Sequence, residues 1–228
     1  MNQVLQWMMP RAFELFQFSV GGTVAKRNLV LQYYSNQKRI LEVGCSVGNI
    51  AVAFRGRGVE YVGIDTDESA INYATKKFRC HTGFSFICGD LCCQRFQHSF
   101  DFIVFSGILH HLDDAAATRL LEFSKESLSP QGVVLVSDPI QPRPEDSALI
   151  KLYRKMERGK YVRNLEELSG LLTNVIGLQI LQQECQSVTA LPFFSKPRVS
   201  YFGVFVLGPR GLSSRVGIAE PLNSNGLV

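Results

Sequence analysis

Several groups of residues in this chain could do chemistry, and each follows a short apolar run. Glu42 lies at the end of one run and is followed by the glycine-rich turn Gly44-Cys45-Ser46-Val47-Gly48. Glycine permits a positive φ and lets a ligand approach the backbone closely. A carboxylate at the end of a strand can accept hydrogen bonds from a cationic or hydroxyl-bearing ligand. The pattern predicts a nucleotide pocket, although a glycine-rich turn can also be a simple packing point.

A second carboxylate, Asp65, follows the apolar run 60–64. An acid about 20 residues beyond the first strand is expected at the tip of the second strand of a βαβ unit, where it can hold both ribose hydroxyls. Asp65 could instead cap a helix, but Asp67 is better placed to cap the helix predicted to run to about Phe78. The spacing from Glu42 therefore strengthens the prediction of a nucleotide site.

Two further positions carry candidate groups. Asp90 follows the third apolar run and could accept a hydrogen bond from an adenine amine, with Leu91 beside the base, or it could be an ordinary turn residue. His110 and His111 follow the fourth run, where α/β sheets place their chemistry. Adjacent side chains diverge, so we expect at most one histidine to face a substrate while the other packs or orients a loop. With a pKa of about 6.5, histidine can act as a base near neutrality.

Short apolar runs alternate with segments of helical periodicity, and the chain ends in a predicted antiparallel hairpin. This pattern predicts an α/β fold: a Rossmann-like sheet of seven strands, mostly parallel with an antiparallel carboxyl-terminal strand, and helices on both faces. The predicted strands are 39–43, 60–64, 84–88, 101–105, 133–137, 178–185 and 198–206, and the predicted helices are 25–34, 50–57, 68–78, 115–128 and 165–174.

The flanking segments predict a cap, a lid and a tail. Residues 1–38 form a predicted amino-terminal helical cap, which could fill a core, close over a substrate, contact a membrane surface or mediate a homodimer. Its charges and Pro10 argue against a transmembrane span or an export signal. Residues 39–207 form the main domain, with a lid-like insertion at about 140–163. Residues 208–228 are predicted to be a disordered tail.

Composition limits the class of protein. A chain of 228 residues with 46% hydrophobic residues can bury one sizeable core. The net charge of +4 is scattered along the chain and argues only weakly for a nucleic acid partner. The six cysteines favour a reduced, cytoplasmic chain, because no secretory signal accompanies them. Cys88, Cys92 and Cys93 lack the paired spacing of a zinc site, so we expect no metal.

The chain resembles the class I S-adenosylmethionine-dependent methyltransferases over nearly all of residues 39–207. Five blocks in the family's order carry the resemblance: EVGCSVG at 42–48, GID at 63–65, CGDL at 88–91, FDFIVFSGILHHL at 100–112 and LSPQGVVLVSDP at 128–139. The family usually has a third glycine where Ser46 stands. The SGILHHL block resembles small-molecule methyltransferases related to those that act on quinones, sterols and natural products.

The resemblance implies the following roles. S-adenosyl-L-methionine would be the cofactor, with its methionine part held by Glu42 and the turn. One of the histidines would lie near the substrate, where it could act as a general base. The implied cofactor-binding residues are Glu42, Gly44, Cys45, Ser46, Gly48, Asp65, Thr66, Asp90, Leu91 and Ser106, and the implied catalytic residues are His110 and His111.

We therefore expect in-line methyl transfer to a small, partly apolar metabolite, with O- or C-methylation favoured over N-methylation. An activated sulfonium methyl group needs mainly positioning and a dry site, so no metal is required. The alternative from another class is a non-catalytic S-adenosylmethionine-binding module or partner subunit. A nicotinamide-dependent oxidoreductase is disfavoured because the turn lacks GxGxxG spacing, and a nucleic-acid methyltransferase ranks low.

Overall fold

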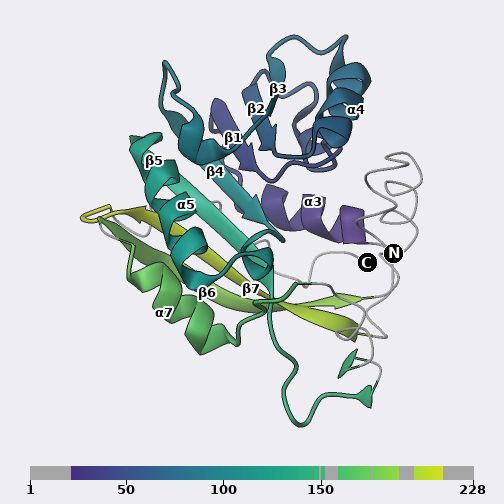
Figure 1. Ribbon diagram of the computed structural model, residues 1–228, viewed down its shortest axis with the longest axis vertical. Helices are drawn as coiled ribbons and strands as arrows, with labels where there is room; N and C mark the ends of the chain where they lie inside the picture. The colour runs from purple at the N-terminus through teal and green to yellow at the C-terminus, as the bar shows by residue number, and fades with distance from the viewer. Residues whose placement is uncertain (1–21, 149, 152–158, 176, 190–197, 213–228) are drawn as a thin grey trace.

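The computed structural model describes residues 22–148, 150–151, 159–175, 177–189 and 198–212 (Figure 1). Most of the predicted amino-terminal cap, much of the predicted lid and all of the predicted tail beyond residue 212 lie outside the described residues. The rest of the chain forms one mixed sheet with helices on both faces.

The sheet has the seven strands predicted for a Rossmann-like fold, and their order is β3-β2-β1-β4-β5-β7-β6. Strands β1 to β5 are parallel, while β7 pairs antiparallel with both β5 and β6. The central strands are apolar because helices cover both of their faces. The strands are β1 Arg39–Val43, β2 Glu60–Asp65, β3 Phe84–Cys88, β4 Phe100–Ser106, β5 Leu128–Pro139, β6 Leu178–Thr189 and β7 Arg198–Pro209.

Polar side chains begin most of the helices. The Asp67 carboxylate accepts hydrogen bonds from the backbone N–H groups of Ser69 and Ala70, at 2.9 and 3.1 Å, which confirms its predicted role as a cap. Asp113 caps the next helix in the same way. The helices are α3 Gly22–Gln32, α4 Glu68–Phe78, α5 Asp114–Glu126 and α7 Leu165–Thr173, and single 3₁₀ turns are η1 Ala51–Phe54, η2 Leu91–Cys93 and η3 Leu109–His111.

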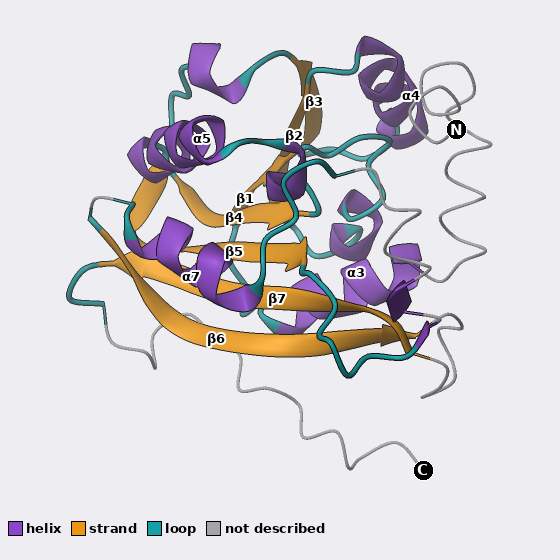
Figure 2. Ribbon diagram, turned by 60° about the horizontal axis from the view of Figure 1, so that its bottom comes forward, coloured by secondary structure: helices purple, strands orange, loops and turns teal. Residues whose placement is uncertain are grey.

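Helices lie on both faces of the sheet (Figure 2), and alternate residues of the central strands face two separate apolar layers. Helices α5 and α7 pack on one face, against Leu41, Ile103 and Val134. Helix α3 packs on the other face, together with η1 and Phe78 of α4, against residues such as Ile40 and Val104. The two-residue period of a strand thus decides whether a side chain faces α5 or α3.

The structure corrects several predicted boundaries. The helix predicted at 50–57 is only η1, because Arg55 leaves the helical conformation with φ −57° and ψ 135°. Strand β5 begins at Leu128 rather than at residue 133. Residues 129–132, which we had predicted to form a turn, lie inside β5, where its pairing with β4 is irregular. A strand tolerates a proline such as Pro130 at such an irregularity. Strands β6 and β7 are longer than predicted, and β7 includes Gly208 and Pro209, which we had placed in the tail.

Among the residues that the structure describes, no helix is both long enough and apolar enough to cross a membrane.

Candidate active site

The predicted site residues converge on one edge of the sheet. Parallel strands β1 to β5 all end there, and their last residues lie in register: Val43 pairs with Ile64, Asp65 with Cys88 and Ser106 with Ser137. The turns that follow these strands carry the glycines, Asp90 and the two histidines. The edge is therefore the place where a ligand could meet all of them, as in other open α/β sheets.

The glycine-rich turn is fitted tightly against its neighbours. Gly44 and Gly48 have φ of 74° and 70°, and Ser46 between them has φ of 48°. A β-carbon on Gly44 would lie 2.6 Å from Ile108 Cδ1, and one on Gly48 would lie 2.9 Å from Phe78 Cε2. The backbone conformation and the close contacts both require glycine at these two positions.

Asp65 connects the end of β2 to this turn. Its Oδ2 accepts a hydrogen bond of 2.8 Å from the Ser46 backbone N–H, and its Oδ1 accepts one of 3.0 Å from the Asp67 N–H. Burial raises the pKa of the Asp65 carboxyl, and these N–H groups oppose that rise. An ionised carboxylate has lone pairs left for ligand hydroxyls beyond these two bonds. Thr66, the next residue, is exposed.

Glu42 lies deeper than the sequence suggested. Its side chain is on the α3 face, only 3% of the residue is exposed, and its Oε2 accepts a hydrogen bond from the Tyr61 hydroxyl of β2. Burial raises the pKa of the Glu42 carboxyl well above its usual value, while the positive charges of Lys26 and Lys77 act to lower it. Tyr61 and Lys26 were not among the predicted site residues, because nothing in the sequence links them to Glu42.

Three other predicted cofactor-binding residues differ in how far their side chains are buried. The Cys45 side chain is buried against Gly63, so only its backbone can face a ligand at the turn. Leu91 is 4% exposed and belongs to the apolar layer under α5. Asp90 is exposed, and its carboxylate accepts a 2.9 Å hydrogen bond from the Cys92 N–H. Asp90 therefore has the turn-capping role that we had left open, and its exposed side chain remains accessible to a ligand.

Two buried hydroxyls lie side by side where β4 and β5 end. Ser106 and Ser137 are register partners on the α3 face, with exposures of 8% and 0%. Within the described part of the chain, neither Oγ has a hydrogen-bond partner. Leaving a buried hydroxyl without a hydrogen-bond partner costs free energy. A polar ligand group at this position could therefore form the missing hydrogen bonds with both hydroxyls.

The two histidines differ in burial, although their rings lie in contact. His110 is 3% exposed, and its Nδ1 lies 3.1 Å from Oδ1 of Asp138, the acid near the end of β5. The same oxygen accepts a 3.1 Å hydrogen bond from the Leu109 N–H. His111 is exposed, and the centre of its ring is 4.0 Å from that of His110. We had assigned no role to Asp138, although an acid at the carboxyl end of a central strand was a usable signal.

The side chain of Lys26, on α3, also lies close to His110. The position that a β-carbon on Gly107 would take is 2.8 Å from Lys26 Nζ and 3.8 Å from His110 Cε1. A cation and an imidazole thus converge above the glycine that follows β4. Together with Ser106, they surround the point where the ends of β4 and β5 meet the glycine-rich turn.

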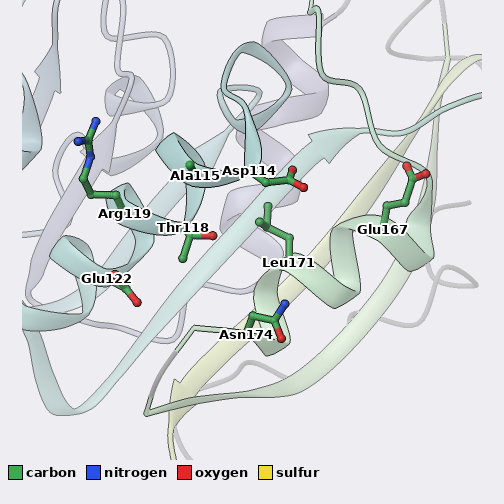
Figure 3. Close-up of a pocket in the computed structure, with 8 residues that line it drawn as sticks. All are labelled: Asp114, Ala115, Thr118, Arg119, Glu122, Glu167, Leu171 and Asn174. Carbon is green, nitrogen blue, oxygen red and sulfur yellow. The ribbon is translucent and has the colours of Figure 1, made fainter.

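A hollow of about 540 Å³ lies elsewhere, between α5 and α7 (Figure 3). It contains none of the predicted site residues. Its lining is mostly polar, from Asp114, Ala115, Thr118, Arg119 and Glu122 of α5 and from Glu167, Leu171 and Asn174 of the α7 region. We assign the chemistry to the strand ends rather than to this hollow. Among the described residues, no group of three or more His, Cys, Asp or Glu side chains is arranged to hold a metal ion.

Comparison with known protein families identifies the family of this chain. Residues 23–183 match a family described as a methyltransferase domain. The chain belongs to this methyltransferase family. The match covers every predicted site residue, from Glu42 to His111. S-adenosylmethionine, the cofactor expected from the resemblance, is the methyl donor of the family.

Individual relatives of this methyltransferase are distant. An uncharacterised methyltransferase of Staphylococcus carnosus is 28% identical over 153 residues, which span 62% of this chain and 70% of the relative. A carboxy-S-adenosyl-L-methionine synthase of Shewanella halifaxensis is 24% identical over 177 residues, 73% and 72% of the two chains. The structure of a mitomycin 7-O-methyltransferase has a similar fold, with a TM-score of 0.66 and 17% identity over 91% of this chain and 60% of the other.

The residues of this methyltransferase fit the cofactor. The turn at Gly44–Gly48 admits close approach to its backbone, and Asp65 stands at the end of β2 with lone pairs left for hydroxyls. The unsatisfied Ser106 hydroxyl lies at the end of β4. When bound, S-adenosylmethionine would supply an activated methyl group at this edge of the sheet.

Proposed function

We propose that this protein transfers the methyl group of S-adenosylmethionine to a small, partly apolar metabolite, at an oxygen or carbon atom. The observation that carries the proposal is the buried His110–Asp138 pair, which lies beside the glycine-rich turn at the carboxyl ends of β4 and β5. A base is useful where the accepting atom must lose a proton, as a hydroxyl or an acidic carbon does.

The cofactor roles that we propose follow the geometry of the edge. The backbone of Gly44, Cys45, Ser46 and Gly48 and the side chain of Ser106 contact the methionine part, and Glu42 acts on its ammonium group from below. Asp65, with Thr66 beside it, binds the ribose hydroxyls. Asp90 and Leu91 flank the adenine.

The proton in this reaction moves to His110. With Nδ1–H donated to Asp138, the lone pair of the ring is on Nε2, which accepts the proton of the substrate hydroxyl. Asp138 orients the ring and stabilises the imidazolium that forms. When bound, S-adenosylmethionine would supply an activated methyl group to the substrate oxygen, and His110 would hold the proton which that oxygen loses. Positioning and exclusion of water supply most of the remaining rate acceleration.

The surroundings of His110 support a partly apolar acceptor. Ile108 packs against the glycine-rich turn, and the backbone N–H of Tyr161 donates a 3.0 Å hydrogen bond to the His110 carbonyl oxygen. Within the described residues, Tyr161 is the one large hydrophobic side chain that is exposed, at 43%. An exposed aromatic ring on the segment whose backbone is hydrogen-bonded to His110 can pack against an apolar substrate while its hydroxyl contacts a polar group.

Calorimetry and product analysis test this function. We expect S-adenosylmethionine and S-adenosylhomocysteine to bind with micromolar affinity, and a panel of phenols, quinols and other small hydroxylated metabolites to reveal formation of S-adenosylhomocysteine. His110→Gln should reduce turnover by about 10²- to 10⁴-fold. The matched control, His111→Gln at an exposed neighbour, should leave it within a few fold. Failure of both nucleosides to bind would overturn the proposal.

Two other functions make different predictions in the same assay. A non-catalytic cofactor-binding module would bind both nucleosides and yield no product with any acceptor. The Shewanella relative is named for synthesis of carboxy-S-adenosyl-L-methionine, so a cofactor-modifying enzyme is a second candidate. Mass spectrometry separates it from a methyltransferase, because a carboxylated cofactor is heavier than S-adenosylmethionine whereas S-adenosylhomocysteine is lighter by one methyl group.

A further inference from the structure

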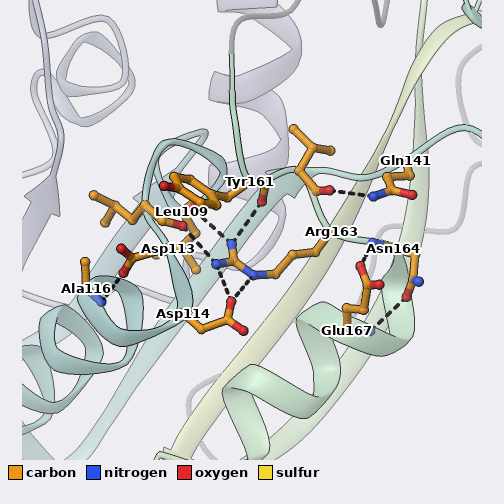
Figure 4. Close-up of polar contacts among 11 residues, drawn as sticks. Leu109, Asp113, Asp114, Ala116, Gln141, Tyr161, Arg163, Asn164 and Glu167 are labelled. Atoms are coloured by element: carbon orange, nitrogen blue, oxygen red, sulfur yellow. Dashed lines mark hydrogen bonds and ion pairs between the residues drawn. The ribbon is translucent and has the colours of Figure 1, made fainter.

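Arg163 is a buried cation with an unusual set of partners (Figure 4). Its guanidinium donates to Asp114 Oδ1 from Nε at 2.9 Å and from Nη2 at 2.6 Å. Nη2 also donates to the Leu112 carbonyl at 2.9 Å, and Nη1 donates to the carbonyls of Leu109 and Tyr161 at 3.0 and 3.2 Å. These bonds use every N–H donor of the side chain.

The charge of Asp114 does not by itself explain why Arg163 is buried. The Arg163 side chain is 8% exposed, whereas that of Asp114 is 81% exposed. Water screens an ion pair in which one partner is so exposed, so the pair adds little to stability. The main-chain carbonyls, of which that of Leu109 is buried, are partners that a planar, forked cation can satisfy together, and lysine cannot match that geometry.

The two carbonyls of Leu109 and Leu112 bracket the two histidines. Arg163 therefore holds the η3 turn at both ends from one side. On the other side, Asp138 binds the Leu109 N–H and the His110 ring. The His110 carbonyl accepts from Tyr161, and a β-carbon on Gly159 would overlap the His110 ring. The segment 159–163 and the end of β5 thus enclose His110 between them.

We propose that Arg163 is a positioning residue that keeps the His110 imidazole aligned with Asp138 by fixing the Leu109 and Leu112 carbonyls. It connects the segment 159–163, the carboxyl-terminal end of the predicted lid, to the base. The proposal rests on the proposed function for its catalytic consequence. The alignment itself is a property of the folded protein and can be measured without a methyl acceptor.

Nitrogen NMR of the histidine side chains tests this alignment in the full chain. We expect wild-type His110 to show a single tautomer with its proton on Nδ1. In Arg163→Gln, which can reach at most one of the carbonyls, we expect mixed tautomers and solvent exchange of the Nδ1 proton about tenfold faster, because two charge-assisted hydrogen bonds that close the turn are lost. His81, which packs on Phe78 and Phe84, provides an internal reference whose signals should not move.

Two further variants keep the test decisive if Arg163→Gln does not fold. Arg163→Lys retains the charge but not the fork, and we expect it to fold and to show the same loss of a single His110 tautomer. Asp114→Asn retains Oδ1 as an acceptor and should leave His110 as in wild type. Arg39→Gln, which removes the partly exposed pair of Arg39 with Asp101, controls for loss of an arginine elsewhere.

A His110 signal unchanged in folded Arg163→Lys or Arg163→Gln would overturn the proposal. So would an effect of Asp114→Asn as large as that of Arg163→Gln, because the surface ion pair would then be the cause. Titration of S-adenosylmethionine into the same samples keeps the two hypotheses apart. A wild-type protein that does not bind the nucleoside contradicts the proposed function, whereas the His110 spectra report on Arg163 alone.

Discussion

Ser46 shows how a single residue is held in a conformation that its type does not favour. Its φ of 48° lies in the left-handed region, where a side chain with a β-carbon is strained. Its N–H donates to Asp65, so the strained backbone aims a donor at the end of β2. Strain of this kind persists only where the surroundings over-determine the conformation, and it is common at ligand-binding turns.

Replacing Ser46 with glycine should therefore stabilise the protein. We expect Ser46→Gly to raise the free energy of unfolding by up to about 1 kcal/mol and to preserve cofactor binding, because glycine adopts this φ without strain. Urea denaturation measures the change. Ser46→Ala is the matched control: it removes the hydroxyl but keeps the β-carbon, and it should give no gain. Equal gains from both variants would assign the effect to the hydroxyl instead.

Glu42 predicts a pH dependence of stability. Since burial raises the pKa of its carboxyl in the folded protein, the folded state holds the proton more tightly than the unfolded chain does. The resulting stabilisation is fully present below the ordinary pKa of 4.5 and is lost as the pH rises toward the raised value. Glu42→Gln, which can still accept from Tyr61, should remove this loss.

Urea titrations between pH 4.5 and pH 8 measure this effect. We expect wild type to lose more stability than Glu42→Gln across that range, because only wild type carries the carboxyl whose pKa burial raises. Glu60→Gln, at an exposed carboxyl on β2, is the control and should follow wild type. Parallel curves for wild type and Glu42→Gln would show that burial of Glu42 does not govern the pH dependence.

At the scale of elements, a glycine of β2 packs tightly against the glycine-rich turn, whereas a glycine of α7 lies in open space. A β-carbon on Gly63 of β2 would lie 2.8 Å from Cys45 Sγ and 2.9 Å from Phe86 Cδ1. One on Gly170 of α7 would meet nothing within 4 Å. The same substitution should therefore have opposite effects in the two elements.

We expect Gly170→Ala to stabilise the protein by about 0.5 to 1 kcal/mol, because alanine loses less backbone entropy in a helix. Gly63→Ala should destabilise it by about 1 to 3 kcal/mol through overpacking, and should weaken S-adenosylmethionine binding because Cys45 must move. Thermal denaturation and calorimetry measure the two quantities, and each variant serves as the other's control. Unchanged cofactor affinity in Gly63→Ala would show that the turn tolerates movement of β2.

At the scale of the whole molecule, the sheet gathers groups from distant segments at one edge. Lys26 comes from α3, Asp65 from β2, His110 from η3 and Asp138 from β5. A ligand that bridges these groups would hold the two apolar layers and the parallel strands together. Binding should therefore stabilise the fold as a unit, by mass action on the folded state.

At a concentration 100 times its dissociation constant, S-adenosylmethionine should stabilise the protein by about 2.7 kcal/mol. For a chain of this size, that corresponds to a rise in Tm of roughly 5 to 10 °C. Asp65→Asn should reduce the rise while His111→Gln should not, since only Asp65 lies at the proposed ribose position. A Tm that does not respond to the nucleoside would contradict the site.

The order of strands and helices could be predicted because it depends on local patterns. The apolar runs that became β1 to β4 are bounded by turn residues, and β1 and β3 match their predicted limits. Asp67 could be identified as a cap because a cap acts on its own helix. The beginning of β5 and the length of η1 could not be predicted, because pairing with β4 in one case and the backbone turn at Arg55 in the other decide them.

The sequence by itself determined the topology, the glycine-rich turn, the acid at the end of β2 and the position of the histidines at the end of β4. These features follow from the types and spacing of neighbouring residues. Only the tertiary structure decided that His110 faces Asp138 while His111 faces solvent, that Glu42 is buried against Tyr61, and that Arg163 clamps the histidine turn. The residues of each of these contacts are separated by 19 to 54 positions, and no local pattern specifies which distant side chain a fold will bring opposite another.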